Sequence, residues 1–472
     1  MNPEGSGSID VRPVKSFFVD MLTRDIALED AILDLLDNCV DGTQRTVSPS
    51  TLESPKPYSG FRAQIDFSSE LFSIEDNCGG IPWELKDYAF RLGRPKSSKP
   101  LGGKALGTYG IGLKRAIFKM GRDCTITTHA SDASYQLRFS DDWMSADDLW
   151  SVEAEAIKQE EIKGTRIIVR ELREGVAERL KSSDFEETFR DAVATQYAYI
   201  IGKGFEVLVN GKVIEGHELR LLFAESSDEA FDSHRIEPYI YETEYEGVSV
   251  FVAVGFTSEI ASKEEADESQ ENYQEKHSPK HSGWTVVCND RTVLYCDKTE
   301  TTGWGVSGVP QHHMQFNAIS GIAIFTSDDP SLLPTNTTKR GIEMQSKVYL
   351  HVRDRMIEGT KIFTAYTNRW KSRELVKRSR EEFRKTTKAD LAYLRKRAKS
   401  VEMSSLKGPL KGRRHSPELP KPNEEGKEAH ISFKRRTEDV QRVSRFLFDD
   451  PTRKASDVGG ECFDLILKES RE

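Results

Sequence analysis

Glycines cluster in the stretch Leu101–Gly121, LGGKALGTYGIGLKRAIFKMG, and this cluster constrains the fold more than any other part of the chain. Gly107, Gly110 and Gly112 form a GxxGxG pattern where a polar loop meets a helical pattern. Flexible glycines at a helix N-terminus expose backbone N–H groups that can bind phosphate oxygens. The stretch lacks the GK[ST] ending of a Walker loop. It also lacks a surrounding βαβ unit with a later acidic strand end, which excludes a Rossmann fold.

The segment Ala31–Gly42, AILDLLDNCVDG, places an acid and an amide on one helical face. Asp34 and Asn38 are four residues apart in a helix expected from about Asp25, taken as its N-cap, to Asn38. A carboxylate there can orient and deprotonate a water molecule, while the amide oxygen of Asn38 can ligate magnesium. A solvated helix face is the open alternative, because both residue types are common on helix surfaces.

An acidic residue also ends the apolar strand pattern in IEDNCGGIP, Ile74–Pro82. A buried Asp76 can accept a hydrogen bond from an adenine amino group, and Gly79 and Gly80 allow the backbone to lie against the base. The alternative is an ordinary strand-ending turn, which DN and GG dipeptides commonly form.

Four elements thus follow one another over residues 34–165. They are the Asp34–Asn38 helix, the Asp76 strand end, the glycine cluster with its lysines, and the Gly164–Thr165 entry into a strand. In this order they resemble the Bergerat-fold ATPases: the gyrase B subunit, HtpG-type heat-shock chaperones, sensor histidine kinases, MutL proteins and Microrchidia ATPases. The resemblance implies an α+β fold in which a Bergerat α/β sandwich binds ATP and Mg²⁺.

The resemblance also assigns roles to residues. It implies that Asp34 is the catalytic base, that Asn38 ligates the metal, and that Asp76 binds adenine with support from Thr165. The implied nucleotide site comprises Asn38, Asp76, Gly80, Ile81, Lys99, Gly107, Tyr109, Gly110, Ile111, Gly112, Leu113, Lys114 and Thr165.

Two residues depart from the family's pattern. Most relatives that hydrolyse ATP carry Glu where this chain has Asp34, so a shorter side chain withdraws the carboxylate and we expect slow turnover. Cys78 replaces the first Gly of the family's DxGxG motif, so a side chain must be accommodated beside the adenine pocket.

A second module is expected from strand-like segments such as VSVFVAVGF and GIAIFTS. Its stretches GWTVVCNDRTVLYCDKTETTGWG and GIAIFTSDDPSLLPTNTTKRGIE resemble the transducer domain that follows the ATPase domain in MutL, gyrase B and Microrchidia proteins. The layout is closest to MutL and Microrchidia. In those relatives a loop lysine reaches the γ-phosphate, and the similarity gives this role to Lys339. A surface lysine in a turn is the open alternative. Sensor kinase activity is excluded, because no histidine precedes His129 to accept the phosphate.

The expected divisions are an ATP-binding domain, a transducer (S5-like) domain, a basic helical region, a linker and a small appendage. Their bounds are 1–180, 181–344, 345–403, 404–430 and 431–472. No run of about 18 apolar residues is present and the N-terminus is polar, so we expect a cytoplasmic protein with no membrane partner. The six cysteines form no CxxC pair, which indicates reduced thiols rather than a zinc site.

Charge is strongly asymmetric along the chain. Between Lys361 and Arg414 lie 18 Lys or Arg and 5 Asp or Glu, although the net charge of the chain is −9. Basic helices with interspersed aromatic residues are compatible with nucleic-acid binding, and solvated helix faces are the open alternative. The candidate contacts are Lys371, Arg373, Lys377, Arg378 and Arg380.

We therefore expect an ATP-gated clamp that forms a homodimer through its N-terminal segments when ATP binds, and that grips DNA or RNA. Such a clamp would act in DNA repair, genome maintenance or bacterial antiviral defence. Two alternatives remain open: a chaperone-type ATPase acting on a protein client, and a weakly hydrolysing scaffold for a separately encoded effector protein.

Overall fold

In a computed structural model, the chain forms two compact units, Met1–Lys421 and Pro422–Glu472. The structure describes residues 14–52, 54–91, 110–147, 149–217, 219–224, 235–262, 265, 281–336, 341–398, 403–406, 412–422 and 432–470.

The first sheet of the larger unit has eight strands among the described residues, in the order β5-β4-β3-β6-β2-β1-β7-β8. All neighbours are antiparallel except β1 and β7, which are parallel. The strands are β1 (Arg62–Phe67), β2 (Phe72–Asp76), β3 (Gly121–His129), β4 (Ser134–Phe139), β5 (Ala154–Ala156), β6 (Gly164–Leu172), β7 (Glu206–Val209) and β8 (Lys212–Val213).

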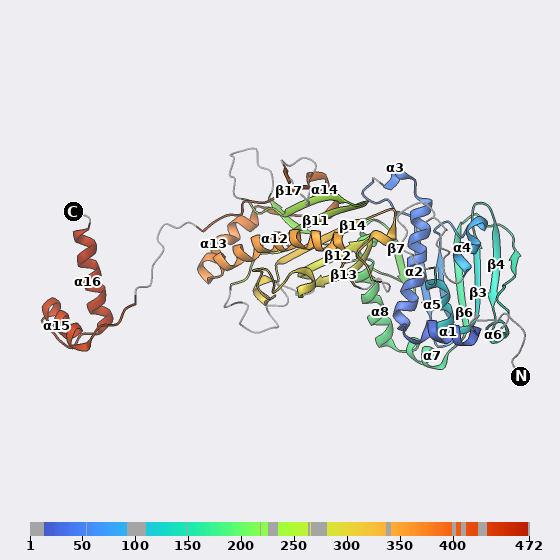
Figure 1. The fold of residues 1–472 in the computed structure, drawn as a ribbon, viewed down its shortest axis with the longest axis horizontal. Helices are drawn as coiled ribbons and strands as arrows, with labels where there is room; N and C mark the ends of the chain where they lie inside the picture. Colours follow the sequence, from blue (N-terminus) through green and yellow to red (C-terminus); the bar gives the residue numbers. More distant parts are fainter. Residues whose placement is uncertain are drawn as a thin grey trace, which may run out of the picture. The chain divides into compact units, whose positions relative to one another are not determined.

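Helices cover one face of this sheet, as Figure 1 shows. Buried and more exposed residues alternate along β1 and β2, so one face of each strand meets the helices. The helices are α1 (Lys15–Arg24), α2 (Leu28–Thr46), α3 (Pro49–Leu52), α4 (Lys86–Phe90), α5 (Gly112–Met120), α6 (Asp141–Ser145), α7 (Glu174–Leu180), α8 (Ser183–Gln196) and α9 (Ala198–Gly202), with a 3₁₀ turn at Trp83–Leu85. We call this sheet with these helices the first module.

Helix α2 carries the acid–amide pair, but its bounds differ from the expected 25–38. Asp25 ends α1 instead of capping α2, because Ala27 is extended, with φ of −68° and ψ of 153°, and breaks the helix there. The helix then continues through Gly42 to Thr46. A Cβ added at Gly42 would lie 2.8 Å from the Cys78 carbonyl oxygen, so glycine allows α2 to approach the end of β2 closely.

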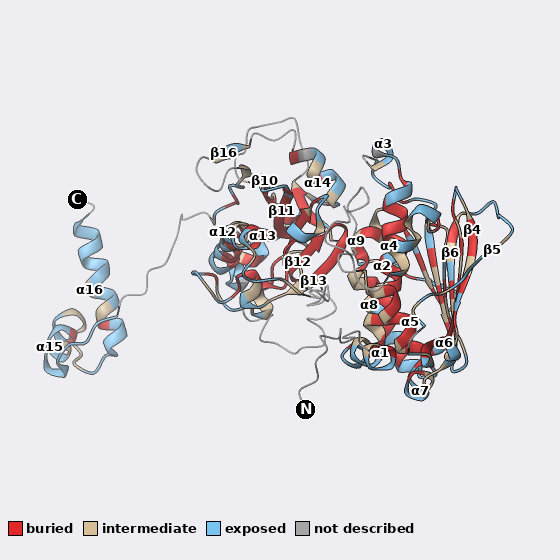
Figure 2. Cartoon of the chain, turned by 45° about the vertical axis from the view of Figure 1, so that its right-hand side comes forward, coloured by how far each residue is buried: buried red, intermediate tan, exposed pale blue. Residues whose placement is uncertain are grey.

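The second sheet has seven strands among the described residues, in the order β13-β12-β14-β11-β10-β17-β16. Helix α12 packs across β10, β11 and β14 on one face (Figure 1). Buried residues fill the centre of this sheet, as the red strands β11 and β12 in Figure 2 show. Its strands are β10 (Tyr239–Tyr245), β11 (Val248–Phe256), β12 (Gly283–Cys288), β13 (Arg291–Asp297), β14 (Ile319–Thr326), β16 (Ser404–Leu406) and β17 (Gly412–His415).

Smaller elements complete the larger unit. The strands β9 (Leu221–Ala224) and β15 (Thr386–Ala389) form a two-stranded sheet. The helices are α12 (Lys347–Trp370), α13 (Arg373–Arg384) and α14 (Leu391–Ala398), with 3₁₀ turns at Glu300–Thr302, Met314–Phe316 and Pro330–Leu332. We call the second sheet and these elements the second module.

The sheets divide the chain differently from the expected boundaries. The first sheet continues past residue 180, since β7 pairs with β1 and its side chains join the first core. The expected linker at 404–430 contributes β16 and β17, because β17 pairs with β10 through residues 240–242. Among the described residues, no helix is both long and apolar enough to cross a membrane.

The smaller unit, Pro422–Glu472, contains two helices in its described part. They are α15 (Thr437–Phe448) and α16 (Ala455–Glu469). Of its described apolar side chains only Val458 is buried, and Ser444 donates to the Asp450 carbonyl oxygen at the bend between the helices.

Candidate nucleotide site

Asp34 and Asn38 lie one turn apart on α2, as the sequence predicts. The Asn38 side-chain nitrogen donates to the Asp34 carbonyl oxygen at 3.0 Å. This bond uses the amide nitrogen, so the carbonyl oxygen Oδ1 is the atom that can ligate a cation. Asn38 is exposed and Asp34 is partly buried, which leaves both accessible to a bound ligand.

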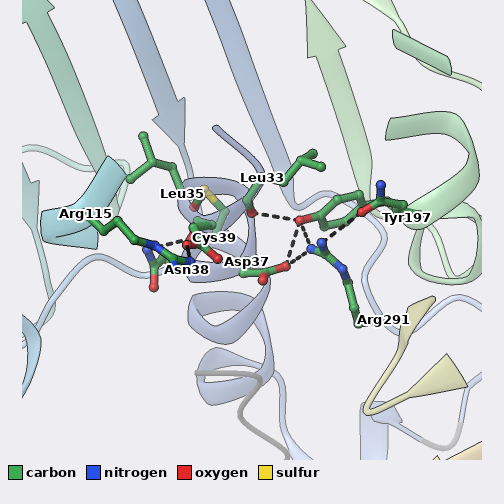
Figure 3. Close-up of polar contacts among 10 residues, drawn as sticks. Leu33, Leu35, Asp37, Asn38, Cys39, Arg115, Tyr197 and Arg291 are labelled. Atoms are coloured by element: carbon green, nitrogen blue, oxygen red, sulfur yellow. Dashed lines mark hydrogen bonds and ion pairs between the residues drawn. The ribbon is translucent and has the colours of Figure 1, made fainter. Parts of the chain in front are cut away.

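The Asp34 carboxylate is held by Arg115 of α5, a partner that the sequence did not suggest. Arg115 Nη2 lies 2.5 Å from Asp34 Oδ2, and the two side chains are 20% and 13% exposed. Gly112, the first residue of α5, packs against the same side chain: an added Cβ would lie 3.4 Å from Asp34 Cγ. The start of the glycine-rich helix and the candidate base are therefore direct neighbours. Figure 3 shows Arg115 reaching toward α2 beside Asn38.

Asp76 ends β2 and lies partly buried beside α2. Its Oδ1 accepts the N–H of Cys78 at 2.7 Å and the N–H of Thr165 at 3.4 Å. Loss of solvation raises the pKa of the Asp76 carboxyl, although the N–H groups of Cys78 and Thr165 and the thiol of Cys39 oppose that shift. A poorly solvated carboxylate held by backbone donors fits the exocyclic amino group of an adenine.

Two glycines, Gly80 and Gly164, allow the backbone to pack closely around Asp76. A Cβ added at Gly80, where φ is 68°, would lie 2.3 Å from the His129 carbonyl oxygen. A Cβ added at Gly164 would lie 1.8 Å from the Asp76 carbonyl oxygen. Any larger residue at Gly164 would push β6 away from the end of β2, where Asp76 lies.

Thr165 lies in a network of hydroxyl groups that positions the backbone after Gly80. Its Oγ1 lies 3.1 Å from Thr128 Oγ1, and the Ile81 N–H donates to the same Thr128 hydroxyl at 2.8 Å. Thr128 on β3 was not among the sequence candidates, because a threonine inside a strand pattern carries no distinctive signal. The network connects two of the implied nucleotide-site positions, Ile81 and Thr165, to Thr128 of β3.

Cys78, which replaces the family's glycine, is accommodated by burial. Its side chain is 1% exposed and lies near Cys39 and Gly42 of α2. Burial raises the pKa of the Cys39 and Cys78 thiols, which favours their neutral forms. All six cysteines are free, and four of them are buried.

The phosphate-site candidates are only partly described. Gly110 has a φ of 66°, and Ile111 is the N-cap of α5. Leu113 is buried against the first core. The Lys114 ammonium is buried and donates to the Ala89 carbonyl oxygen at 2.7 Å. Lys99, Gly107, Tyr109 and Lys339 lie outside the described residues.

The nucleic-acid candidates lie on and just before α13. Lys371, Lys377 and Arg378 are exposed, whereas the side chain of Arg373 is outside the described part. Arg380 is half-buried and pairs with Glu259 and Glu265, at 3.4 and 3.2 Å. Its charge is thus compensated within the chain, whereas Lys371, Lys377 and Arg378 form no ion pair with a described residue.

Comparison with known proteins agrees with this geometry. Residues 26–171 match the family described as histidine kinase-, DNA gyrase B-, and HSP90-like ATPase. The chain matches no curated protein. The match begins just before α2 and ends within β6, so it spans every described element of the site. The chain therefore carries a Bergerat-type ATPase domain of the gyrase, HSP90 and histidine kinase superfamily.

Proposed function

We propose that the chain is an ATP-gated dimeric clamp that binds ATP with Mg²⁺, hydrolyses it slowly and acts on nucleic acid. The observation that carries the proposal is the packing of Asp34 and Asn38 of α2 against the N-terminus of α5. This packing supports a site in which a hydrolytic carboxylate and a metal-ligating amide adjoin phosphate-binding N–H groups.

Each group has a role that fits its surroundings. Asp34 would activate the attacking water, Asn38 would hold the metal, and Asp76 would bind adenine. Bound Mg²⁺ would neutralise charge on the phosphates. The Arg115 partner of Asp34 fixes the direction of the carboxylate and competes with water for one of its oxygens. Together with the short Asp side chain, this competition supports a low turnover.

An apolar stripe on α1 supports dimerisation through the N-terminal region. Phe17 and Met21 are one helical turn apart and are 64% and 53% exposed, and Val14, the N-cap residue of α1, is 51% exposed. The opposite face of the helix is anchored, because the buried Lys15 ammonium lies 3.9 Å from the Trp143 ring centroid. A second protomer would remove the exposed stripe from water, in line with the homodimers common in this superfamily.

The first experiment measures ATP turnover and oligomeric state with and without DNA, RNA and a non-hydrolysable ATP analogue. We expect slow turnover, dimerisation with the analogue, and a change in rate on addition of nucleic acid. Asp34→Ala should abolish turnover but retain analogue binding, whereas Asp66→Ala on β1 should leave both intact. Parent-level turnover by Asp34→Ala would remove the assigned base.

The same experiment tests the dimer surface. Phe17→Ser with Met21→Ser should prevent analogue-dependent dimerisation, because the apolar surface is lost. Asp20→Ser on the same helix is the matched control and should dimerise normally. If the double variant still dimerises with the analogue, α1 is not the dimer surface.

A further inference from the structure

The turn between β12 and β13, formed by Asn289 and Asp290, is buried, whereas most connecting turns lie at the surface. Asn289 is fully buried and Asp290 is 6% exposed. Both have left-handed backbone angles, with φ of 44° and 69°, which Asn and Asp tolerate better than most residues. The Asn289 side chain donates to the Ser327 carbonyl oxygen and accepts from the Ser327 N–H, at 2.9 and 3.0 Å. The turn is therefore fixed to the end of β14.

From this turn Asp290 reaches two residues of the first module. Its carboxylate accepts the Tyr58 hydroxyl at 2.5 Å and the Lys203 ammonium at 2.7 Å. Tyr58 precedes β1 and Lys203 follows α9. Burial and the nearby carboxylate raise the pKa of Tyr58, so its hydroxyl remains a donor. Asp290 thus anchors the second sheet to the first module.

The next residue, Arg291, reaches α2 itself. Its guanidinium bonds to the Asp37 carboxylate and to the Tyr197 hydroxyl, and it donates to Gln196 Oε1 at 3.0 Å (Figure 3). The Tyr197 hydroxyl also contacts Asp37 Oδ1 at 2.7 Å and the Leu33 carbonyl oxygen at 2.9 Å. Arg291 of β13 therefore bonds directly to Asp37 of α2 and reaches the Leu33 carbonyl oxygen, one turn earlier, through Tyr197.

Stability alone does not account for this buried ion pair. Arg291 and Asp37 side chains are 3% and 2% exposed, so both charges are almost fully removed from water. Burying such a pair carries a desolvation cost that apolar side chains of similar volume avoid. The pair instead fixes the orientation of α2, because the planar guanidinium group can donate its hydrogen bonds only to partners in a narrow range of positions.

Asp37 lies next to Asn38 and three residues after Asp34 in one continuous helix. A helix turns as a rigid rod, with a rise of about 1.5 Å per residue. Any rotation or shift of α2 at Asp37 therefore also moves Asp34 and Asn38. We infer that Arg291 is a positioning residue for the nucleotide site: it fixes α2, so the placement of Asp34 and Asn38 depends on the position of the second sheet.

This inference rests on the proposed function for the roles of Asp34 and Asn38. In the reverse direction, a change of nucleotide state that moves α2 is transmitted through Arg291 to β13. The second module is thereby coupled to the site through α2.

The test compares Arg291→Lys with Lys203→Met. Arg291→Lys keeps the positive charge but loses the fork that joins Asp37, Tyr197 and Gln196. We expect kcat to fall at least about tenfold, since small misplacements of catalytic groups are costly. The KM for ATP should stay within about threefold, because Asp76 makes no contact with the turn. Lys203→Met removes a buried charge from the same interface without touching α2 and should keep kcat within about twofold.

Two further measurements keep the test decisive. If Arg291→Lys does not fold, Tyr197→Phe takes its place in the test. This variant retains the ring and removes only the hydroxyl that bonds to Arg291 and Asp37, and it should also lower kcat. Hydrogen exchange of the α2 amides needs no hydrolysis, and these amides should exchange at least about tenfold faster in Arg291→Lys or Tyr197→Phe than in the parent. They should be unchanged in Lys203→Met.

The outcomes separate the two hypotheses. A parent chain without ATP turnover contradicts the proposed hydrolysis, whereas the exchange measurement still tests the positioning role. The inference is overturned if folded Arg291→Lys keeps the parent kcat, if Lys203→Met lowers kcat equally, or if α2 protection is unchanged in every variant.

Discussion

At the scale of single residues, the candidate adenine site around Asp76 depends on close backbone contacts as much as on the Asp76 carboxylate. Gly164→Ala would place a Cβ 1.8 Å from the Asp76 carbonyl oxygen, which the flanking strands cannot accommodate without moving. We expect a loss of unfolding free energy of about 1–3 kcal/mol or more and weakened ATP binding. Gly175→Ala is the matched control, since nothing lies within 4 Å of its added Cβ. Urea unfolding measures both variants, and equal stabilities would contradict the clash.

The Asp76 carboxylate supplies the second prediction. Asp76→Asn replaces an acceptor with a group that can also donate toward the adenine amino group. The loss of one charge-assisted hydrogen bond, about 1.5–3 kcal/mol, corresponds to an increase in the ATP dissociation constant of roughly 10- to 100-fold. Glu75→Gln, one residue earlier and exposed, should bind ATP like the parent. Calorimetric titration with a non-hydrolysable analogue decides the matter, and parent-level affinity in Asp76→Asn would remove the adenine assignment.

Local spacing made some of these residues predictable and left others hidden. Asp34 and Asn38 share a helix, so the period of the helix alone places them together. Arg115 could not be found in this way, because it is 81 residues from Asp34 and meets it only through the packing of α5 on α2. The same limit applies to Arg291, which lies 254 residues from Asp37.

At the scale of elements, α13 presents a basic surface that is only partly available. Lys377 and Arg378 are exposed, whereas Arg380 is engaged by Glu259 and Glu265. Each lysine or arginine that contacts a phosphate contributes roughly one unit to the salt dependence of DNA binding.

Reversal of the two exposed charges tests this surface. Lys377→Glu with Arg378→Glu should lower the slope of log affinity against log salt by about two, because two phosphate contacts are lost. Arg380→Gln should leave the slope unchanged, since its charge is already compensated. Fluorescence anisotropy across a salt series measures all three proteins. An unchanged slope in the double variant would show that α13 does not bind the nucleic acid.

Elements were predictable where their side-chain pattern was continuous, and were missed where pairing decided them. The α+β class and most helices after Gln345 agree with their patterns. The strand Thr386–Ala389 interrupts that helical region, because it pairs with β9, far away in sequence. The strands at 404–406 and 412–415 have a linker-like composition, and only their pairing beside β10 makes them strands.

At the scale of the whole molecule, the buried polar groups of the second module make its stability depend on pH. His312 packs against Trp304, with ring centroids 4.8 Å apart. Burial, together with the nearby positive charge of Lys298, lowers the pKa of His312 to about 4. The unfolded chain, with an ordinary histidine pKa of about 6.5, therefore takes up this proton first as the pH falls.

The sign of the effect follows from that order of protonation. Between pH 6.5 and about 4 the unfolded state binds more protons at this site, so the unfolding free energy decreases as the pH falls through that window. A shift of this size corresponds to roughly 3 kcal/mol once the window has been crossed.

His312→Gln should be less stable than the parent at pH 7, because it loses the ring contact with Trp304. Its unfolding free energy should nevertheless decrease less on acidification than that of the parent. The difference in unfolding free energy between the two proteins should therefore become smaller toward pH 4.5. His313→Gln, at the exposed neighbouring position, should keep most of the pH dependence of the parent, because His313 is the smallest of the three causes that lower the pKa of His312. Urea unfolding at pH 7 and 4.5 measures the three proteins, and a constant gap between parent and His312→Gln would show that this histidine does not contribute to acid sensitivity.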